Sequence, residues 1–151
     1  MQLPETFLEQ MKLLLGTDYD AWLESYDKNP LAGLRFNTVK TYTDEWEGML
    51  SPFALRRVAW TKNGYYIGED AKASRHPYYS GLYYLQEPSA MAPAAVLPVC
   101  PGDKVLDLCA APGGKSTELG ARLQGEGLLV SNDISNSRAK ALLKNLELFG
   151  I

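Results

Sequence analysis

Apolar residues in the first fifty positions recur mainly with helical spacing. Residues 4–16 place them at intervals of three and four between a proline and a glycine, which is typical of an amphipathic helix. Shorter segments with similar spacing predict further helices over 20–26 and 43–50. Between these two, residues 33–38 alternate between apolar and polar side chains, as a half-buried strand does. The pattern therefore predicts three helices and one strand.

Two β-prone runs follow, at residues 57–61 and 65–68, with Asn63 and Gly64 between them. An Asn-Gly pair between such runs favours a tight turn, so we expect a β-hairpin. Together with the preceding helices and strand, the hairpin predicts a small α+β domain over residues 1–75.

The segment 76–102 is rich in tyrosine and turn residues, and it predicts a linker that ends in a short alanine-rich helix. The pattern then changes to strand, helix, strand and helix, which we place at residues 104–108, 115–123, 127–132 and 135–149. This alternation implies parallel strands, because a helix must carry the chain back to the same edge of the sheet. We expect residues 103–151 to form the first β-α-β-α units of a Rossmann-like α/β domain, with an incomplete parallel sheet.

The composition is that of an ordinary globular protein, with 46% hydrophobic and 22% charged residues. Fifteen basic and eighteen acidic side chains give a net charge of −3, which excludes a surface made entirely for polyanions. No apolar run is long enough to span a bilayer and the N-terminus lacks a signal-peptide pattern, so we expect a cytoplasmic protein without a membrane partner. Cys100 and Cys109 are too few for a disulfide framework or a zinc site, and we expect no metal.

The residues between the first strand and the first helix of the α/β domain, 107–116, are mostly small. Such a loop exposes backbone amides at the positive end of the following helix, where nucleotide cofactors bind. A phosphate-binding P-loop would need glycine in place of Cys109, and Gly113-Gly114-Lys115 does not supply the spacing of a dinucleotide motif. What remains is the looser loop of methyltransferases, which curls around the methionine part of S-adenosylmethionine (AdoMet).

We expect this loop and the end of the second strand to form the AdoMet site. The loop residues of the expected site are Cys109, Ala110, Ala111, Pro112, Gly113, Gly114 and Lys115. Asp133 closes the second strand 19 residues after Gly114, where a carboxylate can accept hydrogen bonds from both hydroxyls of a ribose. Arg138 lies one helical turn later and either braces Asp133, contacts the cofactor or lies on a solvated face.

Four motifs indicate a protein family more specifically than the alternation of strands and helices does. They are Asp-Leu-Cys-Ala-Ala-Pro-Gly-Gly-Lys at 107–115, Tyr-Leu-Gln-Glu-Pro-Ser-Ala-Met at 84–91, Asn-Asp-Ile-Ser at 132–135 followed by Arg138, and Arg-Phe-Asn-Thr-Val-Lys at 35–40. Together they resemble the NOL1/NOP2/Sun family of RNA 5-methylcytosine methyltransferases, and the tyrosine-rich residues 76–84 resemble its bacterial 16S ribosomal RNA branch. The resemblance covers about residues 30–150. It implies AdoMet as cofactor and ribosomal RNA, within the small subunit, as partner and substrate.

C5 of cytosine is a poor nucleophile, so an enzyme of this family adds a thiolate to C6 and later removes the C5 proton. The resemblance implies two cysteines for this work, on loops after later strands and beyond Ile151. Neither Cys100 nor Cys109 matches such a position, so we expect no catalytic residue in this chain. Because the sheet is incomplete, we also expect the isolated chain to be marginally stable, self-associating or weak in cofactor binding, and inactive.

RNA would contact basic and aromatic side chains of the N-terminal region. The candidates are Arg35, Asn37 and Lys40, then Arg56, Arg57 and Lys62 as phosphate contacts, and Tyr78, Tyr79, Tyr83 and Tyr84 as stacking faces. A core or solvated role is equally open for each. Two other functions also stay open: a nucleoside-triphosphate-binding enzyme that uses Gly114-Lys115-Ser116, and a non-catalytic RNA-binding or assembly module.

Overall fold

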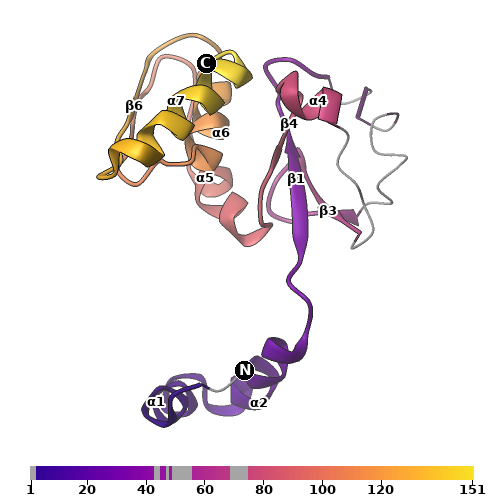
Figure 1. The fold of residues 1–151 in the computed structure, drawn as a ribbon, viewed down its shortest axis with the longest axis vertical. Coiled ribbons are helices and arrows are strands. Elements are labelled where there is room, and N and C mark those ends of the chain that lie inside the picture. The colour runs from indigo at the N-terminus through magenta and orange to yellow at the C-terminus, as the bar shows by residue number, and fades with distance from the viewer. Residues whose placement is uncertain (1–2, 43–44, 47, 49–55, 69–74) are drawn as a thin grey trace. The chain divides into compact units, whose positions relative to one another are not determined.

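The computed structural model describes residues 3–42, 45–46, 48, 56–68 and 75–151, and the chain divides into two compact units. The first unit spans Met1–Pro30 and the second spans Leu31–Ile151 (Figure 1). The helix expected over 43–50 lies largely outside the described residues. Within the described part of the chain, no helix is long and apolar enough to cross a membrane.

Two helices build the first unit, as the apolar spacing predicts. They are α1 (Glu5–Leu15) and α2 (Tyr19–Glu24). Trp22 lies among three aromatic rings, with ring centroids 5.1 to 5.8 Å from those of Phe7, Tyr19 and Tyr26. No side chain of either helix is buried, so this aromatic cluster supplies the main packing between the two helices.

An antiparallel four-stranded sheet begins the second unit, with the strand order β2-β3-β1-β4. Its strands are β1 (Ala32–Phe36), β2 (Arg56–Arg57), β3 (Gly64–Ile67) and β4 (Tyr83–Leu85). β2 and β3 pair antiparallel, which confirms the predicted hairpin, but residues 58–63 connect them and Gly64 already belongs to β3, so the expected tight Asn-Gly turn is wrong. Phe36 of β1 stacks on Trp46 with 5.0 Å between centroids and meets the rings of Tyr65 and Tyr83 edge-on, which forms the core of this sheet.

The tyrosine-rich segment, for which the sequence predicts a linker, contributes structure to this sheet. It contains α4 (Arg75–Tyr79) and then β4, which pairs with β1 and buries Tyr83 to 2% exposure. Between them Gly81 has φ of 69°, and a Cβ there would lie 2.0 Å from the carbonyl oxygen of Leu148. Only glycine allows that approach. The domain boundaries at 76 and 102 stay a prediction, but the first part of this segment forms a short helix and a strand rather than a free connection.

Two β-α units follow in the predicted order. They are β5 (Lys104–Asp107), α6 (Gly114–Leu123), β6 (Leu128–Ser131) and α7 (Asn136–Phe149), and the short helix α5 (Ala92–Val96) precedes them. β5 and β6 pair in parallel, with Asp107 opposite Ser131. α6 packs against α5 and the two strands (Figure 1). Val105, Leu119 and Leu123 belong to one buried cluster. This confirms the predicted Rossmann-like arrangement.

The parallel sheet of the described residues has two strands, and much apolar surface around it is open to solvent. Leu106 and Leu128 on the strands are 58% and 52% exposed, and Leu143 on α7 is 58% exposed. A parallel sheet is normally covered on both faces, so these side chains mark the places where further elements would pack. The predicted incomplete sheet is therefore confirmed.

Candidate cofactor-binding site

The glycine-containing loop leads directly from the end of β5 into the N-terminus of α6. Gly113 is the residue before the helix and has φ of 119°, and a Cβ there would lie 3.3 Å from the Cδ1 atom of Leu142. Both the backbone conformation and the neighbour favour glycine. No side chain caps this end of α6 among the described residues, and its first internal hydrogen bond runs from the amide of Thr117 to the carbonyl of Gly113. The amides of the first turn are therefore directed into the loop.

Below the loop, a buried polar cluster fixes the end of β5. The Asp107 side chain is 4% exposed, accepts a hydrogen bond of 2.8 Å from Ser116 Oγ and lies 3.2 Å from Lys115 Nζ. Lys115 also donates to the carbonyl of Cys109, at 2.6 Å. Ser116 is fully buried and its hydroxyl also contacts Ser131 Oγ at 2.8 Å. A P-loop serine needs its hydroxyl for a magnesium ion, so the burial of Ser116 disfavours a triphosphate site.

Asp133 follows β6 and ties the second strand to the loop. Its Oδ2 accepts from the amide of Ala111 at 3.1 Å, and its Oδ1 accepts from the amide of Ser135 at 3.0 Å. The Ser135 bond most of all, then the Ala111 bond and the positive charges of Arg138 and Lys115, outweigh burial and hold the pKa of Asp133 below its ordinary value. The carboxylate is ionised at neutral pH, and each oxygen retains a further acceptor site.

Two side chains of α7 hold the loop from the other side. Arg138 donates to the carbonyl of Ala111 at 2.6 Å and lies 3.6 Å from Asp133 Oδ2, so it braces the acidic residue. Asn145 donates to the carbonyl of Pro112 at 2.7 Å. Asn145 is not among the residues that the sequence predicts for this site, because a single polar residue in an amphipathic helix is indistinguishable from one on the solvated face.

A cavity of about 390 Å³ opens beside the loop, between it and the segment that follows β4. It is lined by Tyr84, Leu85, Gln86, Glu87, Ala90, Pro93, Ala110, Ala111, Pro112, Gly114 and Lys115. The cavity thus includes a wall formed by residues 84–93, which belong to the segment predicted as a linker. Gln86 of that wall approaches the cofactor loop, since its Nε2 would lie 2.9 Å from a Cβ at Gly114.

Glu87 fixes the turn that leads into α5. Its carboxylate accepts hydrogen bonds from the amides of Ser89 and Ala90 and from the hydroxyl of Ser89. Burial raises the pKa of Glu87, but these hydrogen bonds outweigh it and leave the pKa below its ordinary value. Glu87 is therefore an ionised residue of the cavity lining whose carboxylate is held by its own turn.

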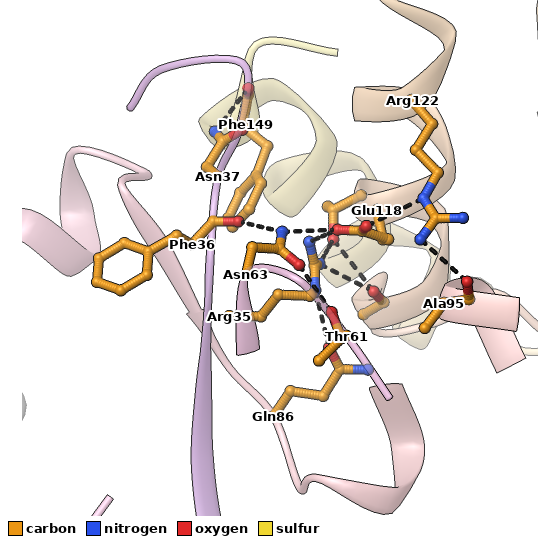
Figure 2. A network of polar contacts seen from close by, with 12 residues as sticks. Arg35, Phe36, Asn37, Thr61, Asn63, Gln86, Ala95, Glu118, Arg122 and Phe149 are labelled. Carbon is orange, nitrogen blue, oxygen red and sulfur yellow. Dashed lines mark hydrogen bonds and ion pairs between the residues drawn. The ribbon is translucent and has the colours of Figure 1, made fainter. Parts of the chain in front are cut away.

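Arg35, predicted as an RNA contact, is buried to 1% exposure and bonds to α6 instead (Figure 2). Its Nη1 donates to Glu118 Oε2 at 2.6 Å, and its Nη2 donates to Thr117 Oγ1 at 2.6 Å and to the carbonyl of Gly114 at 3.0 Å. Its Nε donates to Gln86 Oε1 at 3.1 Å. RNA contact by Arg35 stays a prediction that its burial does not support, because the guanidinium already has four acceptors within the chain.

Asn37 and Lys40, the other predicted RNA contacts, bind the C-terminal end of α7. Asn37 is fully buried and donates to the carbonyls of Gly81 and Phe149 at 2.8 and 3.0 Å. Lys40 is exposed, and its Nζ donates to the carbonyls of Ser80 and Leu148 at 3.1 and 2.7 Å. The motif at 35–40 therefore joins the antiparallel sheet to both helices of the α/β units. RNA contact stays a prediction, and exposure is compatible with it at Lys40 alone among the three.

The remaining candidates differ in exposure. Tyr79 is 63% exposed, whereas Tyr83 lies in the core. Arg56 and Arg57 are exposed on the edge strand β2, with the Arg56 guanidinium 4.4 Å from the ring centroid of Tyr66. Cys100 and Cys109 are both exposed thiols. Stacking on RNA by Tyr79 and phosphate contact by the arginines of β2 remain open, while Tyr83 is a core residue.

Comparisons with known proteins match most of this chain. Residues 3–88 match the family described as the N-terminal domain of 16S rRNA methyltransferase RsmF, and residues 94–151 match 16S rRNA methyltransferase RsmB/F. Curated relatives include the "Ribosomal RNA small subunit methyltransferase F" of Escherichia coli O127:H6, 32% identical over 98% of the chain, and that of Citrobacter koseri, 31% identical. The chain spans about a third of their length, 33% for both.

Two solved structures from Pyrococcus horikoshii share the fold. A methyltransferase homologue superposes with a TM-score of 0.79 at 28% identity, over 99% of this chain and 54% of the other. NSun6 with SFG superposes with a TM-score of 0.81 at 16% identity, over 98% of this chain and 63% of the other. The second likeness concerns the fold alone, since its sequence identity is low.

Proposed function

Because the chain belongs to the family of RsmB/F 16S rRNA methyltransferases, we propose that it is the N-terminal portion of an AdoMet-dependent enzyme that methylates C5 of cytosine in 16S rRNA. One observation carries the cofactor part of the proposal. The first-turn amides of α6 have no side-chain cap among the described residues, and they adjoin the ionised Asp133 through the loop at 109–113.

The chemistry of these groups fits AdoMet. Backbone amides at a helix N-terminus bind a carboxylate, which the methionine part of AdoMet carries. An ionised aspartate at the end of the second strand accepts hydrogen bonds from ribose hydroxyls, and Asp133 is held in that position by the amide of Ala111. The proposed cofactor residues are Cys109, Ala110, Ala111, Pro112, Gly113, Gly114, Lys115, Asp133 and Arg138. AdoMet supplies the methyl group, and these residues bind and orient it.

Ribosomal RNA is the proposed substrate and partner of the complete enzyme. In this division of work the described chain contributes the cofactor loop and the sheet that supports it, and the thiolate that adds to C6 comes from outside residues 1–151. Neither exposed thiol is the proposed nucleophile, since Cys109 lies within the cofactor loop and Cys100 lies in the loop before β5.

Titration of the isotopically labelled chain with AdoMet, followed by the chemical shifts of the backbone amides, tests the cofactor site. We expect weak, saturable shifts at Gly113, Gly114 and Lys115, because nuclear magnetic resonance detects even millimolar binding. Asp133→Asn should weaken binding, since it removes the charge that orders the hydroxyl donors. Asp103→Asn is the matched control: Asp103 lies at the opposite end of β5, where its side chain accepts a hydrogen bond from the amide of Cys100.

Magnesium and ATP provide the competing ligand. Saturable shifts with Mg-ATP that disappear in Lys115→Ala, without shifts from AdoMet, would contradict the proposal and favour a triphosphate site. Equal loss of AdoMet binding in Asp133→Asn and Asp103→Asn would contradict the role of Asp133. Circular dichroism of each variant shows whether the fold is retained.

A further inference from the structure

We propose that Arg35 is a positioning residue of the cofactor loop, which aims the amides of Gly114 and Lys115 at AdoMet from the far side of α6. The inference rests on the proposed function for the identity of the ligand. Its geometric basis is independent of the ligand, because it lies in the polar network between β1 and the first turn of α6 (Figure 2).

The guanidinium reaches both peptide groups of that turn. Its Nη2 donates directly to the carbonyl of Gly114 at 3.0 Å and to Thr117 Oγ1 at 2.6 Å. Thr117 Oγ1 in turn donates to the carbonyl of Gly113 at 2.8 Å. The two carbonyls at the start of α6 are therefore held by one side chain of the antiparallel sheet.

Fixing a carbonyl also fixes the next amide. In a planar trans peptide, the C=O of one residue and the N–H of the following residue point in opposite directions. Holding the carbonyl of Gly113 therefore directs the N–H of Gly114, and holding the carbonyl of Gly114 directs the N–H of Lys115. These are first-turn amides that an anion at the N-terminus of α6 would contact.

The guanidinium itself has little freedom. It is 1% exposed, lies 5.9 Å from the ring centroids of both Tyr84 and Phe149, and pairs with the buried carboxylate of Glu118. Lysine could keep the ion pair with Glu118, but its single ammonium group cannot reproduce the planar fork that spans Glu118, Thr117 and Gly114. Arg35→Lys therefore keeps the positive charge beside Glu118 and removes the hydrogen bonds that hold the first turn of α6.

Arg122 is the matched control within the same network. It pairs with the other oxygen of Glu118 at 3.1 Å and donates to the carbonyls of Ala95 and Leu97, so it holds α5 rather than the loop. Arg122→Lys removes a second guanidinium beside the same carboxylate, although the Arg122 side chain is 27% exposed and that of Arg35 is 1% exposed. Urea unfolding gives the loss of stability of each variant, and a role of Arg35 in stability alone would make the effects on the loop follow that loss.

The test measures two quantities in the 151-residue chain. Hydrogen exchange of the Thr117 amide, which donates to the carbonyl of Gly113, reports the order of the turn. Titration with AdoMet, followed at the amides of Gly114 and Lys115, reports affinity. We expect Arg35→Lys to accelerate the exchange and weaken the affinity by about tenfold each, the effect of one charge-assisted hydrogen bond, and Arg122→Lys to change neither.

The outcomes separate the two proposals. Equal effects of Arg35→Lys and Arg122→Lys on exchange and affinity would overturn the positioning role and leave the cofactor proposal standing. Faster exchange of the Thr117 amide in Arg35→Lys alone, with no AdoMet-dependent shift in the wild-type chain, would support the positioning role of Arg35. The same result would refute AdoMet as the ligand of the loop. If Arg35→Lys fails to fold, Thr117→Val breaks the link to Gly113 while the Arg35–Glu118 pair stays, and the same selective result is expected.

Discussion

Replacement of Gly114 by alanine tests whether this glycine serves close packing rather than backbone freedom. Gly114 does not have a positive φ, but a Cβ there would lie 2.9 Å from Gln86 Nε2 and 3.1 Å from Gln86 Cδ. The Gln86 amide cannot withdraw freely, because it accepts from Arg35 Nε at 3.1 Å and donates to the carbonyl of Ala90 at 2.9 Å. The added methyl group must displace an amide that is bonded at both ends.

The magnitude follows from those two bonds. Losing one neutral and one charge-assisted hydrogen bond costs together about 2–4 kcal/mol. Alanine is better than glycine in a helix by up to about 1 kcal/mol, so Gly114→Ala should lower the free energy of unfolding by roughly 1–3 kcal/mol. In a Gln86→Ala background there is no amide to displace, and the same change should be neutral or slightly stabilising.

Urea unfolding of the four proteins in this double-mutant cycle measures the coupling. The expected interaction energy between positions 86 and 114 is about 2–4 kcal/mol, well above the additivity error of distant sites. If Gly114→Ala has the same cost in both backgrounds, the close contact with Gln86 is not the reason for glycine. The glycine would then serve the bound ligand or the conformation of the helix start.

Two further variants test other parts of the site. Asn37→Ala should lower the free energy of unfolding by about 3 kcal/mol or more, because it leaves the buried carbonyls of Gly81 and Phe149 without donors, while the exposed Asn132→Ala, which loses one bond to Leu108, should cost about 1 kcal/mol or less in the same urea assay. Thermal melts across acid pH test Asp133: since its pKa is lowered on folding, its stabilisation is present above the ordinary aspartate range near about 3.9 and is lost as the pH falls through the folded pKa. Asp133→Asn should therefore lose less stability than the wild type between neutral and acid pH, and parallel curves would refute the assignment.

The cofactor loop was predictable because its determinants are local. Small residues at 109–114 between a strand and a helix already imply a loop that exposes amides, and the structure adds that Gly113 adopts φ of 119°. The position of Asp133 followed from a spacing that a β-α-β unit fixes. What the sequence did not show is that both oxygens of Asp133 already accept backbone amides. Those amides belong to Ala111 and Ser135, and the side chain of Ala111 gives no indication that its backbone binds a carboxylate.

The prediction of a linker for the tyrosine-rich segment missed strand β4, because tyrosine content does not tell whether a segment is exposed or buried. A ring with one hydroxyl group is compatible with a loop, a stacking face or a core. Tyr83 is buried against Phe36, whereas Tyr79 on α4 is mainly exposed. Whether a tyrosine of this segment is buried or exposed depends on the pairing of β4 with β1. The two strands lie about fifty residues apart in the sequence, and neither hydrophobic periodicity nor composition predicts such a contact.

The motif at 35–40 shows that a basic residue whose place in the fold is unknown is weak evidence of RNA contact. A buried cation needs acceptors as strictly as a phosphate needs donors, and Arg35 finds its carboxylate 83 residues away, on Glu118. Asn37 and Lys40 end on carbonyls still farther along the chain, at Phe149 and Leu148. Arg35 binds the carbonyl of Gly114 directly and that of Gly113 through Thr117, whereas Asn37 and Lys40 bind the last turn of α7. The motif at 35–40 therefore holds the antiparallel sheet to both helices of the α/β units.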